Sequence, residues 1–404
     1  MTFNPVKTFQ GTALSKIVSD SLTDCVALIG TGVQAKALAK RLLKDRNLAK
    51  RFIFVERNPL RVDGEIYSVK VVEFNQFIRD VESSSKNYLI IDPPKVDTEL
   101  QELLMTAQKH GAARCSWKKL SRPEAIIEIA SPVVSKTYQN IQGSQTPQFM
   151  SVEKFSAILK KLCVDFRELH SIDLSGRSDP ITHPHLTEII NLTSARTFCS
   201  IITNLNCGSF YIERLAASSI DQIIVDFSEI VSVQNLDTFL ASLDELNKKV
   251  MLNNEIAEIR CRYQKRTRNL CFLPAVQEFC ALIGVRLVTE HAYPDPYEVI
   301  LKYVQTGISD EKIDEVIWDI DAELAKALSQ REKPCLCQRI FPVVNVKAEV
   351  EVCHLYAQPK LSDNYLLEDV DQLVKKRSEF NQCHICQNHG LHRLDLEVLK
   401  HYFG

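Results

Sequence analysis

The distribution of apolar residues along the chain predicts alternating strands and helices. Short apolar runs such as "CVALIG" (25–30) have the length of a buried strand. Stretches such as "TGVQAKALAKRLLKD" (31–45) and "TELQELLMTAQKHG" (98–111) repeat apolar residues every three or four positions, as amphipathic helices do. Because this alternation is typical of a parallel sheet, we expect a Rossmann-like α/β unit over residues 21–118, after an N-terminal arm at 1–20.

The same alternation continues at wider spacing over residues 119–305. Six apolar runs predict its strands: "AIIEIA", "SIDLSG", "CSIITN", "QIIVDF", "KVMLNN" and "VRLVTE". Six strand–helix units suit a partial (β/α)6 barrel, in which ligand-binding loops follow the C-terminal ends of the strands. A linking helix is predicted within residues 306–330, and a small α+β extension within 331–404. The predicted fold class is therefore α/β.

Composition excludes some classes of protein without naming a function. The 404 residues are 45% hydrophobic and 25% charged, and the formal net charge is −2, as in an ordinary globular protein. Such a charge provides no general attraction to nucleic acid or to a membrane surface. No apolar run approaches the roughly 18 residues of a membrane span, and the start lacks the pattern of a secretory signal. We expect a cytoplasmic protein with no membrane and no nucleic-acid partner.

The first strand-to-helix turn carries a candidate nucleotide site. Gly30 and Gly32 follow the first strand, Ala35 opens the helix, and Glu56 ends the next strand, "RFIFVE". In a dinucleotide fingerprint the glycines let a phosphate approach the helix N-terminus, and the acid contacts a ribose. A tight turn that binds nothing explains the same residues equally well. The following run "ERNPLRVDGEIYSVKVV" resembles small Rossmann-like domains at the front of sugar-modifying enzymes.

The C-terminal segment carries a candidate metal site. The chain has 13 cysteines, and most of the earlier ones stand singly in apolar stretches, where a thiol behaves as a small hydrophobe. The cysteines of the tail are spaced more closely, at Cys335, Cys337, Cys353, Cys383 and Cys386. In a reducing compartment this spacing favours a metal over disulfides. Spacing alone leaves zinc and an iron–sulfur cluster open.

The loop "IDLSGRSDPITHPHLTEII" resembles the radical SAM superfamily, in which a strand ends in a loop that contacts the amino group of S-adenosylmethionine (SAM). Gly176 matches a family glycine, Ser178 replaces another, and Asp179 replaces the family glutamate. The run "IITN", which ends at Asn204, resembles the family's "iTNG", with Leu205 where glycine is usual. The resemblance covers roughly residues 121–290 and implies that this loop contacts SAM.

The motif that defines the superfamily is missing. It should follow the first barrel strand as CxxxCxxC and hold a [4Fe–4S] cluster, but Val133, Thr137 and Asn140 occupy the three positions. None of these side chains binds iron in that role. Because the cluster delivers the electron that cleaves SAM, we expect no reductive SAM cleavage.

The tail resembles the SPASM-type extension of the same superfamily, which holds an auxiliary iron–sulfur cluster. The matching runs are "CLCQRIFPVVNVKAEVEVCHLY" and "RSEFNQCHICQNHGLH", with Ala348 where the hairpin glycine is usual. The resemblance implies one [4Fe–4S] cluster, with zinc as the alternative. Its implied ligands are Cys353, Cys383 and Cys386, with Cys335, or alternatively Cys337, as the fourth.

Two classes of function follow from these residues. The first is a non-catalytic or partner subunit that assists an intact radical SAM enzyme acting on a peptide or sugar substrate. The second is an enzyme with altered, non-radical chemistry that uses bound SAM or a nucleotide. The basic run "RCRYQKRTR" (260–268) is either a solvated surface or an anion-binding loop after the fifth strand.

Overall fold

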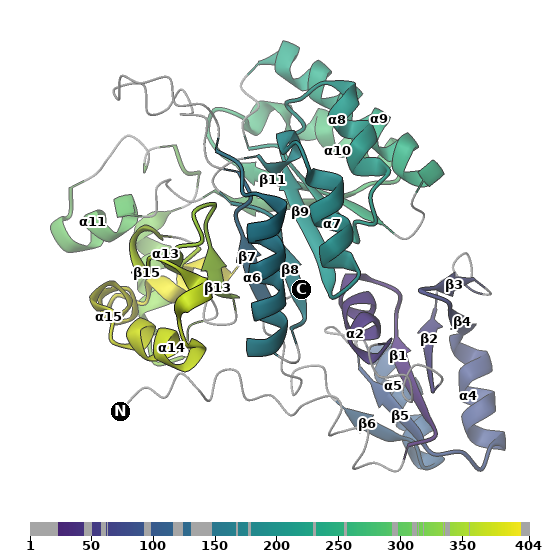
Figure 1. The fold of residues 1–404 in the computed structure, drawn as a ribbon. Coiled ribbons are helices and arrows are strands. Elements are labelled where there is room, and N and C mark those ends of the chain that lie inside the picture. Colours follow the sequence, from purple (N-terminus) through teal and green to yellow (C-terminus); the bar gives the residue numbers. More distant parts are fainter. Residues whose placement is uncertain are drawn as a thin grey trace.

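A computed structural model shows two sheets with their helices (Figure 1). The residues that it describes are 23–43, 51–57, 62, 64–92, 98–115, 124–130, 148–166, 169–176, 179–228, 232–253, 257–292, 298–308, 313, 315–317, 319–333, 335, 340–354 and 356–396.

The first sheet has the strand order β3-β4-β2-β1-β5-β6, and only β3 runs antiparallel to its neighbour. Its strands are β1 (Cys25–Ile29), β2 (Phe52–Glu56), β3 (Glu65–Ile66), β4 (Val69–Glu73), β5 (Tyr88–Ile91) and β6 (Ala113–Cys115). Its helices are α2 (Val33–Leu43), α4 (Phe74–Ser83) and α5 (Thr98–Lys109). Val26 and Leu28 belong to one apolar core and Ala27 and Ile29 to another, so β1 is buried on both faces. This explains its uninterrupted apolar sequence.

The second sheet has nine strands in the order β12-β11-β10-β9-β8-β7-β13-β14-β15, and the neighbours from β12 to β13 pair in parallel. The strands are β7 (Glu124–Ile127), β8 (Ser171–Asp173), β9 (Phe198–Thr203), β10 (Gln222–Asp226), β11 (Glu258–Lys265), β12 (Arg286–His291), β13 (Ile340–Val344), β14 (Val350–Cys353) and β15 (Tyr356–Ser362).

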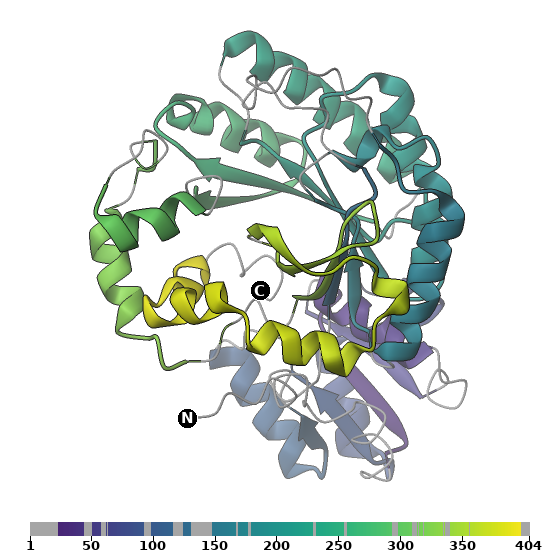
Figure 2. The same cartoon turned by 60° about the vertical axis from the view of Figure 1, so that its left-hand side comes forward.

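Helices lie around the outer side of this curved sheet, and the C-terminal segment lies across its open side (Figure 2). The α-helices are α6 (Val152–Asp165), α7 (Leu186–Ser194), α8 (Ser209–Ala216), α9 (Val233–Asn253), α10 (Leu273–Leu282), α11 (Glu298–Thr306), α13 (Ile320–Leu328), α14 (Val370–Ser378) and α15 (Asn381–Asn388). The 3-10 helices are η5 (Pro180–Thr182), η6 (Leu270–Phe272), η8 (Tyr365–Leu367) and η9 (Leu391–Leu396). No helix in the described ranges is both long and apolar enough to cross a membrane.

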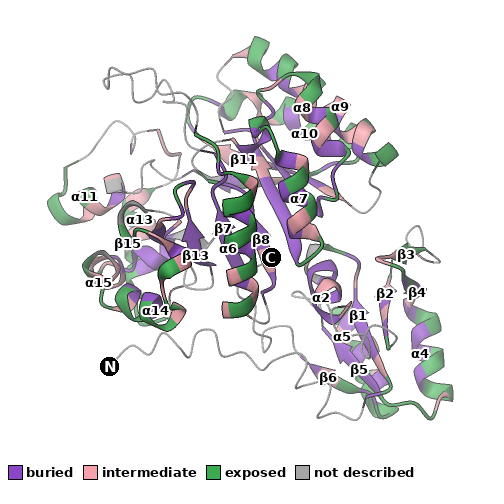
Figure 3. Cartoon of the chain, viewed as in Figure 1, coloured by how far each residue is buried: buried purple, intermediate pink, exposed green. Residues whose placement is uncertain are grey.

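The two faces of the large sheet have opposite character, although both are largely buried (Figure 3). The outer face is apolar and forms the core beneath the helices, with residues such as Ile172, Ile201 and Cys261. Successive side chains of a strand point to opposite faces, so the residues between them form the inner face. This polar face includes Glu124, Asp173, Ser200, Gln222, Asp226, Arg260 and Arg262.

The predicted α/β class and its parallel sheets are confirmed, whereas one predicted strand is wrong. The described part of the run "KVMLNN", residues 249–253, belongs to α9, and its Met251 and Leu252 are 67% and 83% exposed rather than in a sheet. The fifth strand is β11 (Glu258–Lys265), which overlaps the basic run at 260–268 that the sequence analysis placed after the fifth strand. Its apolar residues alternate with arginines, which is the pattern of a strand between an apolar and a polar surface.

The C-terminal segment continues the large sheet. β13 pairs with β7 in parallel, and β13 and β14 form the predicted antiparallel hairpin. Ala348 in the hairpin turn has a φ of +72°, a left-handed conformation that explains why glycine is usual at this position in the sequences it resembles. Within the predicted linking helix, the structure describes only α13 as an α-helix. Closure of the sheet into a partial barrel stays a prediction.

A buried ion pair joins the two units. Asp221, which precedes β10 and is 2% exposed, accepts hydrogen bonds from Lys40 Nζ of α2 (2.5 Å) and from Tyr67 Oη (2.5 Å). It also accepts one from the backbone N–H of Cys199 (2.8 Å). The first unit therefore contacts the N-terminal end of the parallel strands of the second.

Candidate functional site

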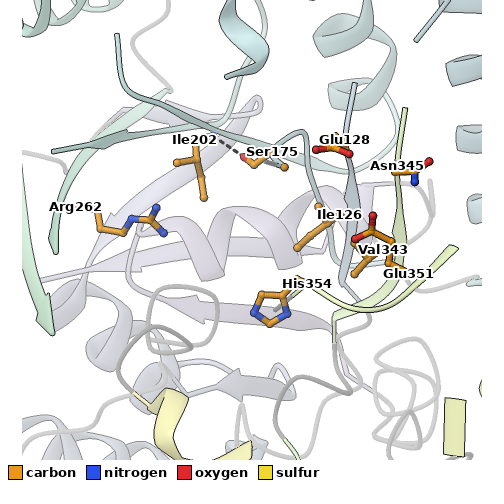
Figure 4. A pocket seen from close by; sticks show the side chains of 10 residues that line it. Ile126, Glu128, Ser175, Ile202, Arg262, Val343, Asn345, Glu351 and His354 are labelled. Atoms are coloured by element: carbon orange, nitrogen blue, oxygen red, sulfur yellow. Dashed lines mark hydrogen bonds between the residues drawn. The ribbon is translucent and has the colours of Figure 1, made fainter. Parts of the chain in front are cut away.

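A cavity of about 190 Å³ lies on the polar face, toward the C-terminal ends of the strands. In α/β folds this edge of a parallel sheet is where ligands bind. Six of the lining residues come from β7, β8, β9, β11 or the turns that follow them, and the other four come from the β13–β14 hairpin and the residue after it. The lining residues are Ile126, Glu128, Ser175, Gly176, Ile202, Arg262, Val343, Asn345, Glu351 and His354 (Figure 4).

Glu128 lies directly against the loop after β8. A Cβ atom added to Gly176 would come within 2.5 Å of Glu128 Cγ and 2.7 Å of its Oε1. Only glycine leaves room for this carboxylate, which is 6% exposed. The backbone N–H of Glu128 also donates to the carbonyl oxygen of Val344 in the hairpin (2.8 Å), so two separate elements hold Glu128 in place.

Arg262 enters the cavity from β11 and forms an ion pair with Asp226 of β10. Asp226 also accepts hydrogen bonds from the backbone N–H and the hydroxyl of Ser228. Burial by itself would raise the pKa of Asp226, but the Arg262 guanidinium and the Ser228 bonds outweigh it and lower that pKa. The guanidinium charge is therefore compensated within the protein before any ligand arrives.

Ser175 joins the cavity to the polar face beneath it. Its hydroxyl donates to Asp173 Oδ1, and it accepts a hydrogen bond from the backbone N–H of Ile202 (2.7 Å; Figure 4). These contacts connect the C-terminal ends of β8 and β9, and they fix the β8 loop, including Gly176, relative to the strands.

Asp179 connects the same loop to the end of β9. Its Oδ1 accepts from the N–H of Ile181 (3.0 Å), and its Oδ2 accepts from Thr203 Oγ1 and from the N–H of Asn204 (both 2.8 Å). Burial raises the pKa of Asp179 above its ordinary value, and these hydrogen bonds, which act in the opposite direction, offset only part of that rise. Both carboxylate oxygens thus bond to the chain itself, and the described contacts of Asp179 and Asn204 are structural. Ser178 lies outside the described residues.

The residue after Asn204 has the backbone of a glycine. Leu205 has a φ of +53°, in the left-handed region, and its side chain is 3% exposed. Thus the position where the resemblance expects glycine keeps a glycine-like conformation while it holds a core side chain.

The glycines of the first unit form the expected strand-to-helix turn. Gly30 has a φ of +89°, and no heavy atom lies within 4 Å of a Cβ added to either Gly30 or Gly32. Glu56 accepts a hydrogen bond from Thr31 Oγ1 (2.5 Å) and another from the N–H of Arg57 (2.8 Å). The acid that the fingerprint directs to a ribose therefore bonds to the glycine turn itself.

Two cysteines of the tail, Cys335 and Cys353, lie near Cys383. Burial raises the pKa of the Cys383 thiol to about 12, and the nearby Cys353 and Cys335 sulfurs act in the same direction. Cys386 is buried in the same core. These residue types suit iron–sulfur or zinc ligation, but among the described residues no three cysteine, histidine or acidic side chains are grouped as metal ligands. Cys337 lies outside the described residues.

The positions that replace the missing cluster motif, Val133, Thr137 and Asn140, also lie outside the described residues.

Sequence reasoning missed most of the cavity. Gly176 was identified, and the basic run contains Arg262, but Glu128 and Glu351 were not identified as site residues. The sequence did carry a signal for β11, the alternation of apolar and basic residues. It also carried one for Glu128, which is a charged residue inside an apolar run.

No family model and no curated protein matches the chain. Solved structures that it resembles include native anSMEcpe with bound AdoMet, at 13% identity and a TM-score of 0.41, covering 69% of this chain and 97% of that one. BtrN in complex with AdoMet and 2-DOIA has 12% identity and a TM-score of 0.38, and the match covers 67% of this chain and 88% of that one. Archaeal TYW1 has 15% identity and a TM-score of 0.27, and the match covers 38% of this chain and 60% of that one. Identities and TM-scores of this size establish neither a family nor an activity for this chain.

Proposed function

We propose that the protein is a radical SAM-like subunit that binds a small polar molecule in the cavity of its large sheet and does not cleave SAM. The observation that carries this proposal is the position of the cavity, at the C-terminal side of the parallel strands and beneath the β13–β14 hairpin. In this role it would assist an intact radical SAM enzyme that modifies a peptide or a sugar.

Two kinds of residue support the loss of SAM cleavage. No thiol is present at Val133, Thr137 or Asn140, where the resemblance requires all three cluster ligands. In addition, the described hydrogen bonds of Asp179 hold the β8 loop to β9. The alternative, an enzyme that uses bound SAM in polar chemistry, needs a carboxylate that contacts the ligand, and for Asp179 the structural role is the simpler explanation.

The test is an assay of 5′-deoxyadenosine after anaerobic incubation of reconstituted protein with SAM and dithionite. We expect no more product than in a control without protein. Product at catalytic turnover numbers would refute the proposal. Product made only after an intact radical SAM enzyme is added, and above the amount which that enzyme makes alone, would support the partner role.

We propose further that the tail cysteines hold one [4Fe–4S] cluster. Three observations support this: the cysteine spacing, the closeness of Cys335, Cys353 and Cys383, and the burial of Cys386. Anaerobic purification should give a broad absorbance band near about 400 nm, with iron and sulfide in roughly equal amounts. Cys383→Ser should lose the metal, whereas Cys163→Ser, in α6, should keep it. Stoichiometric zinc would retain the site and refute the cluster.

A further inference from the structure

His183 is a buried histidine in the loop that follows β8, between η5 and α7. It is 1% exposed, and both nitrogens of its ring contact the backbone. Nε2 lies 2.9 Å from the carbonyl oxygen of Met150, and Nδ1 accepts a hydrogen bond from the N–H of His185 (3.0 Å). A carbonyl oxygen only accepts and an amide N–H only donates, so these partners require a proton on Nε2 and none on Nδ1. Both contacts therefore need the neutral ring.

The two partners of His183 belong to different loops at the C-terminal ends of the strands. Met150 comes just before α6, and its N–H donates to the carbonyl oxygen of Ile129 (2.9 Å), so it closes the base of the loop after β7. His185 lies at the start of α7 and ends the loop after β8. His183 thus fastens one loop to the other.

The surroundings of His183 oppose a positive charge on its ring. Burial lowers the pKa of His183, and the positive charges of His185 and of Arg214 on α8 lower it further, whereas the bond to the carbonyl oxygen offsets part of this effect. The acids on the neighbouring helices, Glu153 of α6 and Glu188 of α7, interact with the exposed His185 instead. The ring is therefore kept neutral in the folded protein.

We propose that His183 is a pH-sensitive clamp, which joins the loop after β7 to the loop after β8 at neutral pH and releases them in acidic solution. When the clamp opens, the imidazole reaches water and titrates near its ordinary pKa of about 6.5. The open state then binds more protons than the closed state, so opening becomes easier as the pH falls below about 6.5. Glu128 and Gly176, which line the cavity, adjoin the same two loops, so release would loosen one wall of the cavity.

Hydrogen–deuterium exchange of the full chain at pH 7.5 and pH 5.5 tests the clamp, after correction for the pH dependence of the intrinsic exchange rate. One pH unit below the pKa of the open state, we expect amide protection of residues 183–186 to fall about five- to tenfold. His183→Gln supplies a donor and an acceptor that do not titrate, so its protection should fall less than twofold. His185→Gln is the matched control: it removes an imidazole that is 61% exposed and keeps the backbone N–H, so the fall should match that of the unmodified protein.

α9 serves as the internal reference, because its protection reports the stability of the large unit and should change less than twofold. Loop protection that does not fall with pH overturns the inference, as does an equal fall in α9, which would indicate general unfolding. A fall that persists in His183→Gln also overturns it and assigns the response to another group of the loop, such as Asp179. Circular dichroism checks that the variants are folded, and His183→Asn replaces a Gln variant that is not. The clamp does not depend on the proposed function, which the assays for 5′-deoxyadenosine and iron judge separately.

Discussion

The contact between the two units predicts a large loss of stability when Asp221 is replaced. The Lys40 and Asp221 side chains are 12% and 2% exposed, and their charged atoms are 2.5 Å apart. Asp221→Ala removes the carboxylate acceptor of the Tyr67 hydroxyl and of the Cys199 N–H, and it leaves the Lys40 ammonium with the Ser194 carbonyl oxygen (3.1 Å) but without its counter-charge. Removal of one partner from a buried ion pair costs about 3–5 kcal/mol, because the other charge stays buried without compensation.

Two further variants separate the parts of this contact. Tyr67→Phe removes one hydrogen bond to the carboxylate and keeps the ion pair, so it should cost about 1.5–3 kcal/mol. Burial and the neighbouring Asp221 raise the pKa of Tyr67, which keeps its hydroxyl protonated as a donor. Lys40→Met should cost less in an Asp221→Ala background than alone, since the two effects share one interaction.

The assay is urea unfolding followed by circular dichroism, with Asp244→Ala as the control. Asp244 pairs with Lys248 one turn along α9, and the lysine side chain is 71% exposed. Removal of such a surface pair should cost about 0.5 kcal/mol or less. The reasoning is refuted if Asp221→Ala costs no more than this control, or if a double-mutant cycle finds no coupling between Lys40 and Asp221.

Three other predictions concern the two candidate sites. Gly176→Ala should destabilise the protein by about 1–3 kcal/mol in urea unfolding, because the added Cβ displaces Glu128; unchanged stability would contradict this. Arg262→Met leaves Asp226 buried without its cation and so raises the pKa of that carboxyl. The resulting loss of about 3 kcal/mol at pH 7 should shrink as the pH falls toward 4 and Asp226 takes up a proton, whereas a loss independent of pH would argue against the pair. Gly32→Ala meets no neighbouring atom and should change stability by less than about 1 kcal/mol, so any nucleotide affinity that it removes in calorimetry reports the ligand's approach to this turn.

The sequence by itself determined the local elements wherever a short run of residues carries the complete pattern of the element. β1 is apolar throughout because it is buried on both faces, and α5 ends near Gly111, which has a φ of +93°. The α/β class follows from the alternation of apolar runs, whereas the hairpin of β13 and β14 was implied by the resemblance of the tail. In these places the residues within one short window contain the whole signal.

Only the tertiary structure decided which polar residues lie inside. The arginines of β11 look like a solvated surface in the sequence, but the curvature of the sheet encloses them on its polar face. At "KVMLNN" the apolar run suggested a buried strand, but it lies in α9. Val250 is on the buried face of this helix, whereas Met251 and Leu252 are exposed.

The cavity itself depends on contacts between distant parts of the chain. Glu128 and Arg262 reach one space only because parallel pairing carries their strands into the same sheet, and Glu351 joins them only because β13 pairs with β7. A local pattern sets whether a segment extends or coils, since it acts through neighbouring residues. The packing of the whole sheet then decides which face of each strand is enclosed and which charged residues lie next to one another. Every strand contributes to that packing.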